Sequence, residues 1–248
     1  MDPRIFAIVP AQLRLTPCFA AVNGYDDILY TVSSRKGYPH DPDRAVCPAV
    51  SHRPIFVALA DDREVLGWYP AESLFLNLHG NYDYMTAGYY ISQDLEAQGY
   101  PVAPTCLDIL DGYVVPLMLE KARLAGLPVP GYYITNGYFE PPVIVDPVNP
   151  FMSGHSIVLK RGHQERVARS MTRNSTYAIC CQELPPGAQV RSFRAVLGWS
   201  ADKRYRELAA GIWRVFRIPA AVVRVVIGED GRPLLSALQP LTKLKAKE

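Results

Sequence analysis

Two adjacent cysteines, Cys180 and Cys181, are the side chains in this sequence that come closest in type to a catalytic nucleophile. They lie in an apolar run, YAICCQEL. Such a run is more typical of buried strand residues than of a reactive thiol, which needs electropositive and accessible surroundings. Cys18, Cys47 and Cys106 bring the count to five. An odd count without CxxC spacing fits neither a disulfide framework nor a zinc site, and it favours the reducing cytoplasm.

Other residue types suited to catalysis or metal binding lack the spacing that such chemistry needs. His79 and His155 have no second histidine at HxH or HExxH spacing, so we expect no metal site. Ser153 lies in MSGH rather than in a GxSxG elbow, and the sequence contains no GxGxxG or Walker pattern. Asp61 and Asp62 are expected at an exposed turn. The sequence therefore identifies no catalytic residue.

Two segments are better suited to binding than to catalysis. The loop Asn149–His155, NPFMSGH, could cradle an anion with its backbone N–H groups, and the alternative is an ordinary glycine-containing hairpin turn. A group of tyrosines could stack a ring-shaped ligand, although packing against a neighbouring element is the more common use. The group consists of Tyr82, Tyr84, Tyr89 and Tyr90.

The elements that would position these residues begin with an α/β segment. Short apolar runs predict strands at residues 5–9 and 54–60, separated by a polar, turn-rich loop at 33–44. A further strand is predicted over 74–78. Apolar residues at spacings of four then predict a helix over 85–98, which Gly99 would end.

The remainder is expected to be rich in strands, with two helices. Pro116 and Gly126 lie at the positions where helices favour proline and glycine, which predicts a helix between them. Several β-branched or aromatic runs follow. Ser200 is a candidate cap for an amphipathic helix whose apolar stripe runs from Tyr205 to Phe216. A hairpin is expected to turn at 229–231.

Length and composition limit the class of protein. A chain of 248 residues with 49% hydrophobic and 20% charged residues is globular and long enough for one large domain or two modest ones. A net charge of +2 argues against a nucleic-acid partner held by general phosphate neutralisation. No apolar run reaches the roughly 18 residues that span a bilayer, and the N-terminus lacks a signal pattern. We therefore expect a cytoplasmic protein without a membrane partner.

The order of these motifs resembles the ATP-grasp superfamily, in particular the RimK-like and D-alanine–D-alanine-ligase-like carboxylate–amine ligases. The similarity extends over about residues 74–241 and comprises a helix with LAGLPVP, the segment PVIVDPVNPFMSGHSIV, a strand ending in QELPPG, a long helix and a hairpin around EDG. The resemblance implies an α/β protein in which two α+β subdomains enclose ATP. Its predicted parts are an N-terminal α/β, pre-ATP-grasp-like domain (1–108), an ATP-grasp-like domain of two subdomains (109–241) and a charged tail (242–248).

Several positions depart from what the resemblance implies for ATP and magnesium. A family lysine that reaches the phosphates aligns with Asp146, and a second aligns with Val114 or Val115. A carboxylate that faces phosphate without compensation is unfavourable by roughly 4 kcal/mol at 4 Å and an effective dielectric constant of 20. Magnesium needs carboxylate and other oxygen ligands, so we expect its usual site to be missing. The positions aligned with the metal ligands are Arg224, Ala237 and Gln239.

Other positions keep the residue types that the resemblance implies. Gln182 and Glu183 match the hinge that reads the nucleotide, with an exposed strand end as the alternative. Ser153, Gly154 and His155 lie in the loop that matches the phosphate-covering loop. Replacement positive charge could come from four residues that more commonly form a solvated face, namely Lys160, Arg161, Arg191 and Arg194. Substrate contacts are expected from Asn77, His79 and Asn81.

Two functions remain open. In the first, the chain is a pseudoenzyme derived from ATP-dependent carboxylate–amine ligases, which binds a small molecule or a partner subunit, or forms a homo-oligomer, in a biosynthetic pathway. In the second, it is an active ligase in peptide or cofactor modification with relocated phosphate-binding residues. The resemblance implies ATP or ADP as the cofactor, whereas magnesium is not expected. The missing cations favour the first function on chemical grounds.

Overall fold

The chain divides into two units, one that includes the described residues from 55 to 106 together with residue 241, and one formed by residues 107–240. The computed structural model describes residues 55–58, 65–69, 72, 74–149, 151–152 and 154–241. The strand predicted at 5–9, the loop at 33–44, the pair Asp61 and Asp62, Ser153 and the tail 242–248 lie outside the described residues.

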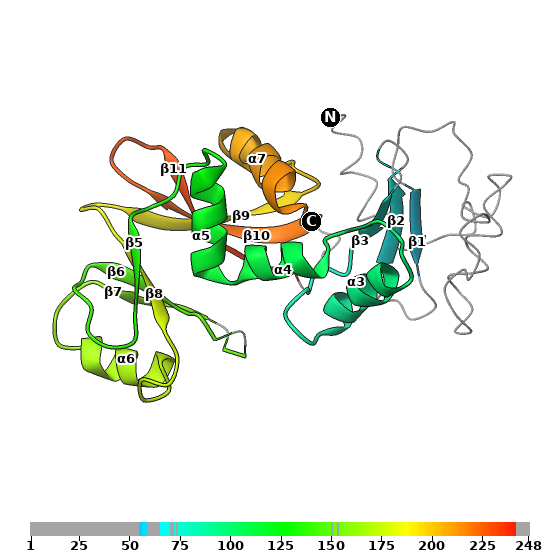
Figure 1. Cartoon of the computed structure of the whole chain (residues 1–248). Helices are drawn as coiled ribbons and strands as arrows, with labels where there is room; N and C mark the ends of the chain where they lie inside the picture. The colour runs from blue at the N-terminus through cyan, green and yellow to red at the C-terminus, as the bar shows by residue number, and fades with distance from the viewer. Residues whose placement is uncertain are drawn as a thin grey trace, which may run out of the picture. The chain divides into compact units, whose positions relative to one another are not determined.

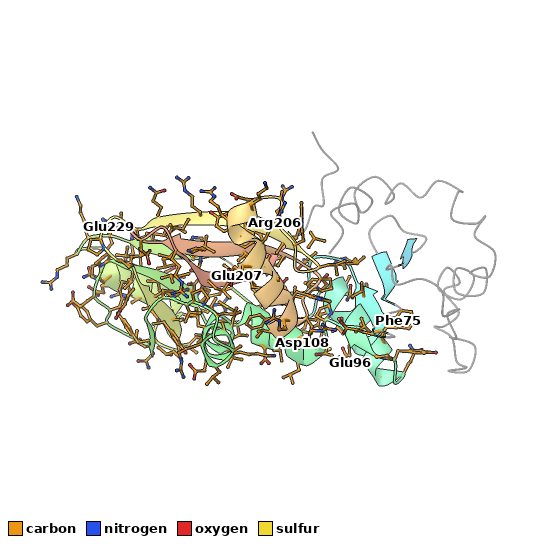
Figure 2. The ribbon with its side chains drawn as sticks, turned by 90° about the horizontal axis from the view of Figure 1, so that it is seen from above. Phe75, Glu96, Asp108, Arg206, Glu207 and Glu229 are labelled. Atoms are coloured by element: carbon orange, nitrogen blue, oxygen red, sulfur yellow. The ribbon has the colours of Figure 1, made fainter. Side chains whose placement is uncertain are left out.

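The first unit contains a four-stranded sheet in the order β1-β2-β3-β4. Its strands are β1 (Ile55–Ala58), β2 (Val65–Tyr69), β3 (Leu74–Asn77) and β4 (Val102–Ala103). The helix α3 (Ala87–Ala97) connects β3 to the parallel strand β4. Its Ile91 and Leu95 pack against Phe75 of β3 and Val102 of β4. Figure 2 labels Phe75 and, on α3, Glu96.

The helix predicted over 85–98 is confirmed, since α3 occupies Ala87–Ala97. Gly99 has a φ of 80°, and its N–H donates to Glu96 O at 2.9 Å. This left-handed conformation favours glycine, because other residues carry a Cβ that crowds the backbone. The glycine ends the helix as the sequence predicts.

The second unit begins with two helices and a four-stranded antiparallel sheet. The helices are α4 (Cys106–Tyr113) and α5 (Val115–Leu124), and Pro116 lies in the first turn of α5, as predicted. The sheet has the order β5-β8-β6-β7 and consists of β5 (Tyr132–Thr135), β6 (Val143–Pro147), β7 (Ser156–Val158) and β8 (Ile179–Glu183). The helix α6 (Gln164–Met171) packs on one face, in a core that includes Val145, Ile179 and Cys181.

A second, three-stranded antiparallel sheet completes this unit, in the order β11-β10-β9 (Figure 1). Its strands are β9 (Gln189–Val196), β10 (Ala220–Ile227) and β11 (Pro233–Pro240), so the predicted hairpin between β10 and β11 is confirmed. The helix α7 (Arg206–Phe216) lies across these strands, and Arg206 and Glu207 mark its beginning in Figure 2. Both sheets together with their helices give the α+β architecture that was predicted.

The cap of the long helix differs from the prediction. Ser200 is buried, and the chain first forms a short 3₁₀ turn, η2 (Lys203–Tyr205). Asp202 caps this turn, because its Oδ1 accepts a hydrogen bond from the Arg204 N–H at 3.0 Å. The apolar stripe from Tyr205 to Phe216 is buried as expected. Within the described residues no helix has the length and apolar character required to cross a lipid bilayer.

Candidate functional site

The two sheets of the second unit face each other through alternate residues of their strands. In β9, β10 and β11 the register places Ser192, Arg224 and Ala237 in one row across the sheet. Since strand side chains alternate between faces, the rows two residues away point to the same side. One of these rows contains Val190, Val226 and Leu234, and the other contains Arg194, Val222 and Gln239.

An apolar cluster joins the two sheets at one end of this interface. Val226 of β10 packs with Ile144 of β6 and with Leu184, and all three are buried. Ile144 lies on the face of its sheet opposite to α6, because its neighbours Val143 and Val145 belong to the core under that helix. Asp146, two residues further along β6, therefore projects toward the second sheet as well.

Asp146 and Arg224 form a buried ion pair between the two sheets. The Nη2 of Arg224 donates to Oδ2 of Asp146 at 2.7 Å, and the two side chains are only 5% and 1% exposed. Charge-assisted bonds of this length are about twice as strong as neutral ones. Each charge nevertheless costs several kcal/mol to remove from water, so the two residues stabilise the fold only as a pair.

Two further buried residues complete the network around the ion pair. The Nε2 of Gln182 donates to Asp146 Oδ2 at 2.8 Å and to the backbone oxygen of Ser236 at 2.9 Å. The Nε of Arg224 donates to Ser236 Oγ at 2.9 Å. Among the described protein groups, Nη1 of Arg224 and Oε1 of Gln182 are buried without a partner. The network thus links four strands, β6, β8, β10 and β11, while two of its polar atoms stay unsatisfied.

His155, at the end of the β6–β7 loop, interacts electrostatically with both members of the ion pair. Its pKa is lowered from the ordinary 6.5, first because its ring is partly removed from water and second because of the positive charge of Arg224. The carboxylate of Asp146 acts in the opposite direction. His155 keeps an exposed surface, and it follows Gly154, whose φ is 97°. Burial and Arg224 thus both favour the neutral form of this histidine, which lies within electrostatic range of both charges.

The positions at which the resemblance implies a lysine and metal ligands come together in space, but they carry different chemistry. Asp146 and Arg224 bind each other, and Ala237 is the register partner of Arg224. Gln239 lies one row further along, opposite Val222. The alternatives for the second lysine, Val114 and Val115, are the N-cap and the first residue of α5. No group of three His, Cys, Asp or Glu side chains that could hold a metal ion exists within the described ranges.

The four cations considered as replacements are dispersed. Arg194 and Arg191 both extend from β9, but an odd separation along a strand puts them on opposite faces, and only Arg194 shares the face of Arg224. Arg161 pairs with Glu140 at 3.2 Å. Lys160 lies beyond the end of β7 and is exposed. The structure therefore gathers one of the four, Arg194, on the side of the ion pair.

The hinge residues Gln182 and Glu183 have separate surroundings. Gln182 is completely buried in the network, so its amide serves the protein interior. Glu183 is exposed at the end of β8, where its N–H donates to Gly131 O at 2.8 Å and its side chain lies over that glycine. A carboxylate in this place can accept from a ligand in solvent, whereas the side chain of Gln182 is buried.

The loop that was expected to cradle an anion connects the paired strands β6 and β7. At its start Asn149 is buried, and its Oδ1 accepts from the Phe151 N–H at 2.9 Å. The Met152 N–H donates to Asn149 O at 3.1 Å. Gly154 and His155 are exposed. The described part of the loop has the form of a hairpin connection, and Gly154 and His155 keep exposed surface at its end.

The residues expected to contact substrate hold the loop between β3 and α3 together. The Nδ2 of Asn77 donates to Gly88 O at 2.6 Å and to Ser92 Oγ at 2.9 Å, and its Oδ1 accepts from the His79 N–H. The Nδ1 of His79 lies 3.1 Å from Asn81 O. Tyr82 is buried and donates to Asn77 O at 2.6 Å, and the loss of contact with water raises the pKa of its hydroxyl. These contacts make Asn77 a structural residue of the first unit.

This chain resembles solved structures that include ATP-grasp proteins and a D-alanine–D-alanine ligase. A RimK domain ATP-grasp protein from Sphaerobacter thermophilus DSM 20745 matches with a TM-score of 0.48 and 17% identity, over 65% of this chain and 71% of its own. The ATP-grasp ligase PsnB, complexed with precursor peptide PsnA2 and AMPPNP, matches with a TM-score of 0.44 and 19% identity, over 61% of this chain and 58% of the PsnB chain. D-alanine–D-alanine ligase from Bacillus anthracis, complexed with ATP, matches with a TM-score of 0.45 and 11% identity. The match covers 61% of this chain and 64% of the ligase chain.

The chain spans less than two thirds of the PsnB and D-alanine–D-alanine ligase chains. No protein-family model matches the sequence, and no curated protein does either.

Sequence reasoning missed the pairing of Asp146 with Arg224 and the part that Ser236 plays in it. A signal for the pairing was present, because an acid stands where the resemblance implies a lysine and an arginine stands where it implies an acid. Two opposite departures at facing positions indicate a contact. Ser236 gave no such signal, since a serine in an apolar strand carries no charge.

Proposed function

We propose that this chain is an ATP-grasp-like pseudoenzyme, derived from ATP-dependent carboxylate–amine ligases, that binds a small molecule or a partner subunit without using ATP and magnesium. The observation that carries the proposal is the buried pair of Asp146 and Arg224. In the family, these two positions would present a cation to phosphate and a carboxylate to magnesium. Here each charge is reversed and satisfied by the other.

The charge arrangement explains why a triphosphate would bind poorly beside this pair. The carboxylate of Asp146 repels phosphate, and the guanidinium of Arg224 repels a divalent cation. Releasing either side chain to a ligand would leave the other as an unpaired buried charge, which costs about 3–5 kcal/mol. Ala237 provides no metal ligand beside them. The two buried charges of this interface therefore cancel each other.

The alternative, an active ligase with relocated cations, has limited support. Arg194 lies on the face of Arg224 and is exposed, so it could contact an anion. Arg191 lies on the opposite face, and Arg161 is engaged by Glu140. Only one of the four candidate cations lies on this face, and Arg224 beside it is engaged by Asp146, so the positive charge is less than a triphosphate and its metal normally require.

A thermal-stability measurement with nucleotides tests the proposal. The melting temperature of the full chain would be recorded with ADP and with ATP, each with and without magnesium. A ligand at 100 times its Kd adds about 2.7 kcal/mol, which corresponds to about 5–10 °C for a chain of this size. We expect no shift. A magnesium-dependent rise of that size would contradict the proposal.

An ADP-release assay separates the two functions further. We expect no release above the spontaneous rate with any carboxylate and amine pair. If release occurs, Glu183→Ala should abolish it, because Glu183 is the exposed carboxylate at the hinge. Unchanged release in that variant would exclude Glu183 as a nucleotide contact.

A further inference from the structure

A cavity of about 660 Å³ lies on the α6 side of the four-stranded sheet. It is separate from the ion pair, because α6 packs against Val145, Ile179 and Cys181, whereas Asp146 and Gln182 project from the other face. A volume of this size falls within the range of small-molecule sites, about 300–1,000 Å³. No role was predicted for its residues.

The floor of the cavity is one row along α6. Gln164, Ala168 and Thr172 follow at spacings of four, so they lie on the same face of the helix, and all three are buried. The small side chain of Ala168 leaves room above the middle of the row. The row spans about 12 Å at 1.5 Å per residue.

Polar groups that have no partner in the described part of the chain surround this floor. The amide side chains of Asn136 and Asn174 line the cavity, one from the β5–β6 connection and one from the turn after α6. Gln164 uses its Oε1 to accept from the Gly162 N–H at 2.6 Å, which leaves its Nε2 to donate. Thr172 uses its Oγ1 to accept from the Ser175 N–H at 2.8 Å, which leaves its own proton to donate.

The turn that carries Asn174 holds an unusual conformation. Arg173, Asn174 and Ser175 have φ values of 48°, 55° and 66°, in the left-handed region that residues with a side chain rarely adopt. Each such residue costs about 1–2 kcal/mol. The bonds from Asn174 N to Arg169 O at 2.9 Å and from Tyr177 N to Thr172 O at 2.8 Å hold the turn in place. The polar side chains at 174 and 175 are thus presented from a fixed backbone.

An aromatic ring forms one wall. Tyr138 is 65% exposed, and its hydroxyl donates to Glu140 Oε1, which fixes the ring. Glu140 is held in turn by Arg161. Among the other lining residues, Glu165 and Arg169 pair at 2.6 Å and neutralise each other. The cavity therefore offers a flat ring, amides that both donate and accept, and no net charge.

We infer that this cavity binds an uncharged ligand rich in hydroxyl groups, of the size of one or two sugar rings. Hydroxyl groups donate and accept, as the amides of Asn136, Asn174 and Gln164 do. One face of a sugar ring carries C–H groups, whose positive charge matches the negative face of the Tyr138 ring. A peptide fits less well, because peptide recognition needs side-chain pockets and the lining contains only Ala168 and Tyr138 as apolar side chains.

This inference does not depend on the proposed function, since the cavity and the ion pair lie on opposite faces of the sheet. The test uses the full chain with glucose, N-acetylglucosamine and maltose as probes. The signals of the side-chain amides at 136, 164 and 174 are followed by nitrogen-15 NMR. We expect saturable shifts of these three amides with at least one probe.

Two variants show whether binding takes place in the cavity. Asn174→Gly removes the amide and keeps the turn, because glycine adopts positive φ readily. Asn136→Ala removes the other amide from an exposed loop. Each should weaken binding about tenfold, the loss of roughly 1.4 kcal/mol. A matched control, Arg173→Gly, changes the same turn without touching the cavity lining and should leave the affinity unchanged.

Three outcomes would overturn the inference. The first is the absence of saturable shifts with all three sugars. The second is sugar binding that neither variant weakens, which would place it elsewhere. The third is saturation of the same amide signals by N-acetyl-glycyl-glycine amide but by none of the sugars, which would identify the site as a peptide site.

Discussion

Asp146 and Arg224 are 78 positions apart in the chain, and they meet through a 2.7 Å contact that joins the two sheets of the second unit. Neither charge has another ionic partner within the described residues. The cost of burying each charge is therefore offset only by the other and by the hydrogen bonds from Gln182 and Ser236. Stability and binding chemistry depend on the same two side chains.

The ion pair should behave as a unit in a double-mutant cycle. Asp146→Ala or Arg224→Ala alone should lower the free energy of unfolding by about 3–5 kcal/mol, because a buried charge loses its partner. The double variant Asp146→Leu with Arg224→Met, which replaces both charges with apolar residues, should lose far less unfolding free energy than the two single variants lose together. Urea denaturation measures each value. As a control, Glu165→Ala, which breaks an exposed pair, should change stability by less than about 1 kcal/mol.

The titration of His155 should report both charges. The pKa of His155 in the folded protein lies below the ordinary 6.5 of the unfolded chain, so the unfolded chain binds more protons between these two pKa values. The free energy of unfolding should therefore fall as the pH is lowered from 6.5 through the pKa of the folded protein. Arg224→Gln should raise the pKa of His155, and Asp146→Asn should lower it further. NMR titration of the ring protons measures both shifts. If His155 had the same pKa in the unmodified protein, in Arg224→Gln and in Asp146→Asn, the electrostatic interaction of His155 with the ion pair would be contradicted.

Asn77→Ala should destabilise the first unit. The substitution leaves Ser92 Oγ and the Gly88 carbonyl without their buried donor, at a cost of about 1–3 kcal/mol. Faster hydrogen exchange at the amides of α3 would show the loosened helix. If Asn77 instead serves only as a substrate contact, as the sequence predicted, exchange in the free protein should be unchanged.

Gly88→Ala should disturb the same region for a steric reason. A Cβ at Gly88 would overlap the carbonyl oxygen of Asn81 and lie 2.9 Å from His79 Nδ1. The backbone oxygen cannot rotate away, so α3 or the loop must shift, and overpacking of this kind costs about 1–3 kcal/mol. Gly137→Ala is the control, because no atom lies within 4 Å of its Cβ position. Equal melting temperatures for the two variants would contradict the described contact.

Much of the second unit was predictable because its helices and turns carry local signals. Pro116 and Gly126 marked α5, and the apolar stripe from Tyr205 to Phe216 marked α7. The helix α6 escaped prediction, since the segment QERVARSM has few apolar residues and buries only Gln164, Ala168 and Met171. Its position is determined by packing on the sheet, which a local pattern does not encode.

The candidate sites were less predictable because they depend on contacts between distant strands and loops. Gln182 matched a hinge in the sequence but turned inward, since a strand alternates faces and Glu183 took the exposed one. The cavity near α6 combines residues around 137, 165 and 174, each unremarkable alone. Asn77, His79 and Asn81 form a local cluster, and their mutual hydrogen bonds could only be seen in three dimensions.

The side chains of the neighbouring cysteines of β8 lie on opposite faces of the sheet. Cys180 shares the face of Asp146, and Cys181 packs in the core under α6. Both thiols are buried, and burial raises the pKa of each, that of Cys181 to about 11. Alkylating reagents can therefore reach them only during transient opening. Cys180 would be modified when the two sheets separate, and Cys181 when α6 detaches from its sheet. The two adjacent thiols can therefore report which of these two local openings occurs more readily.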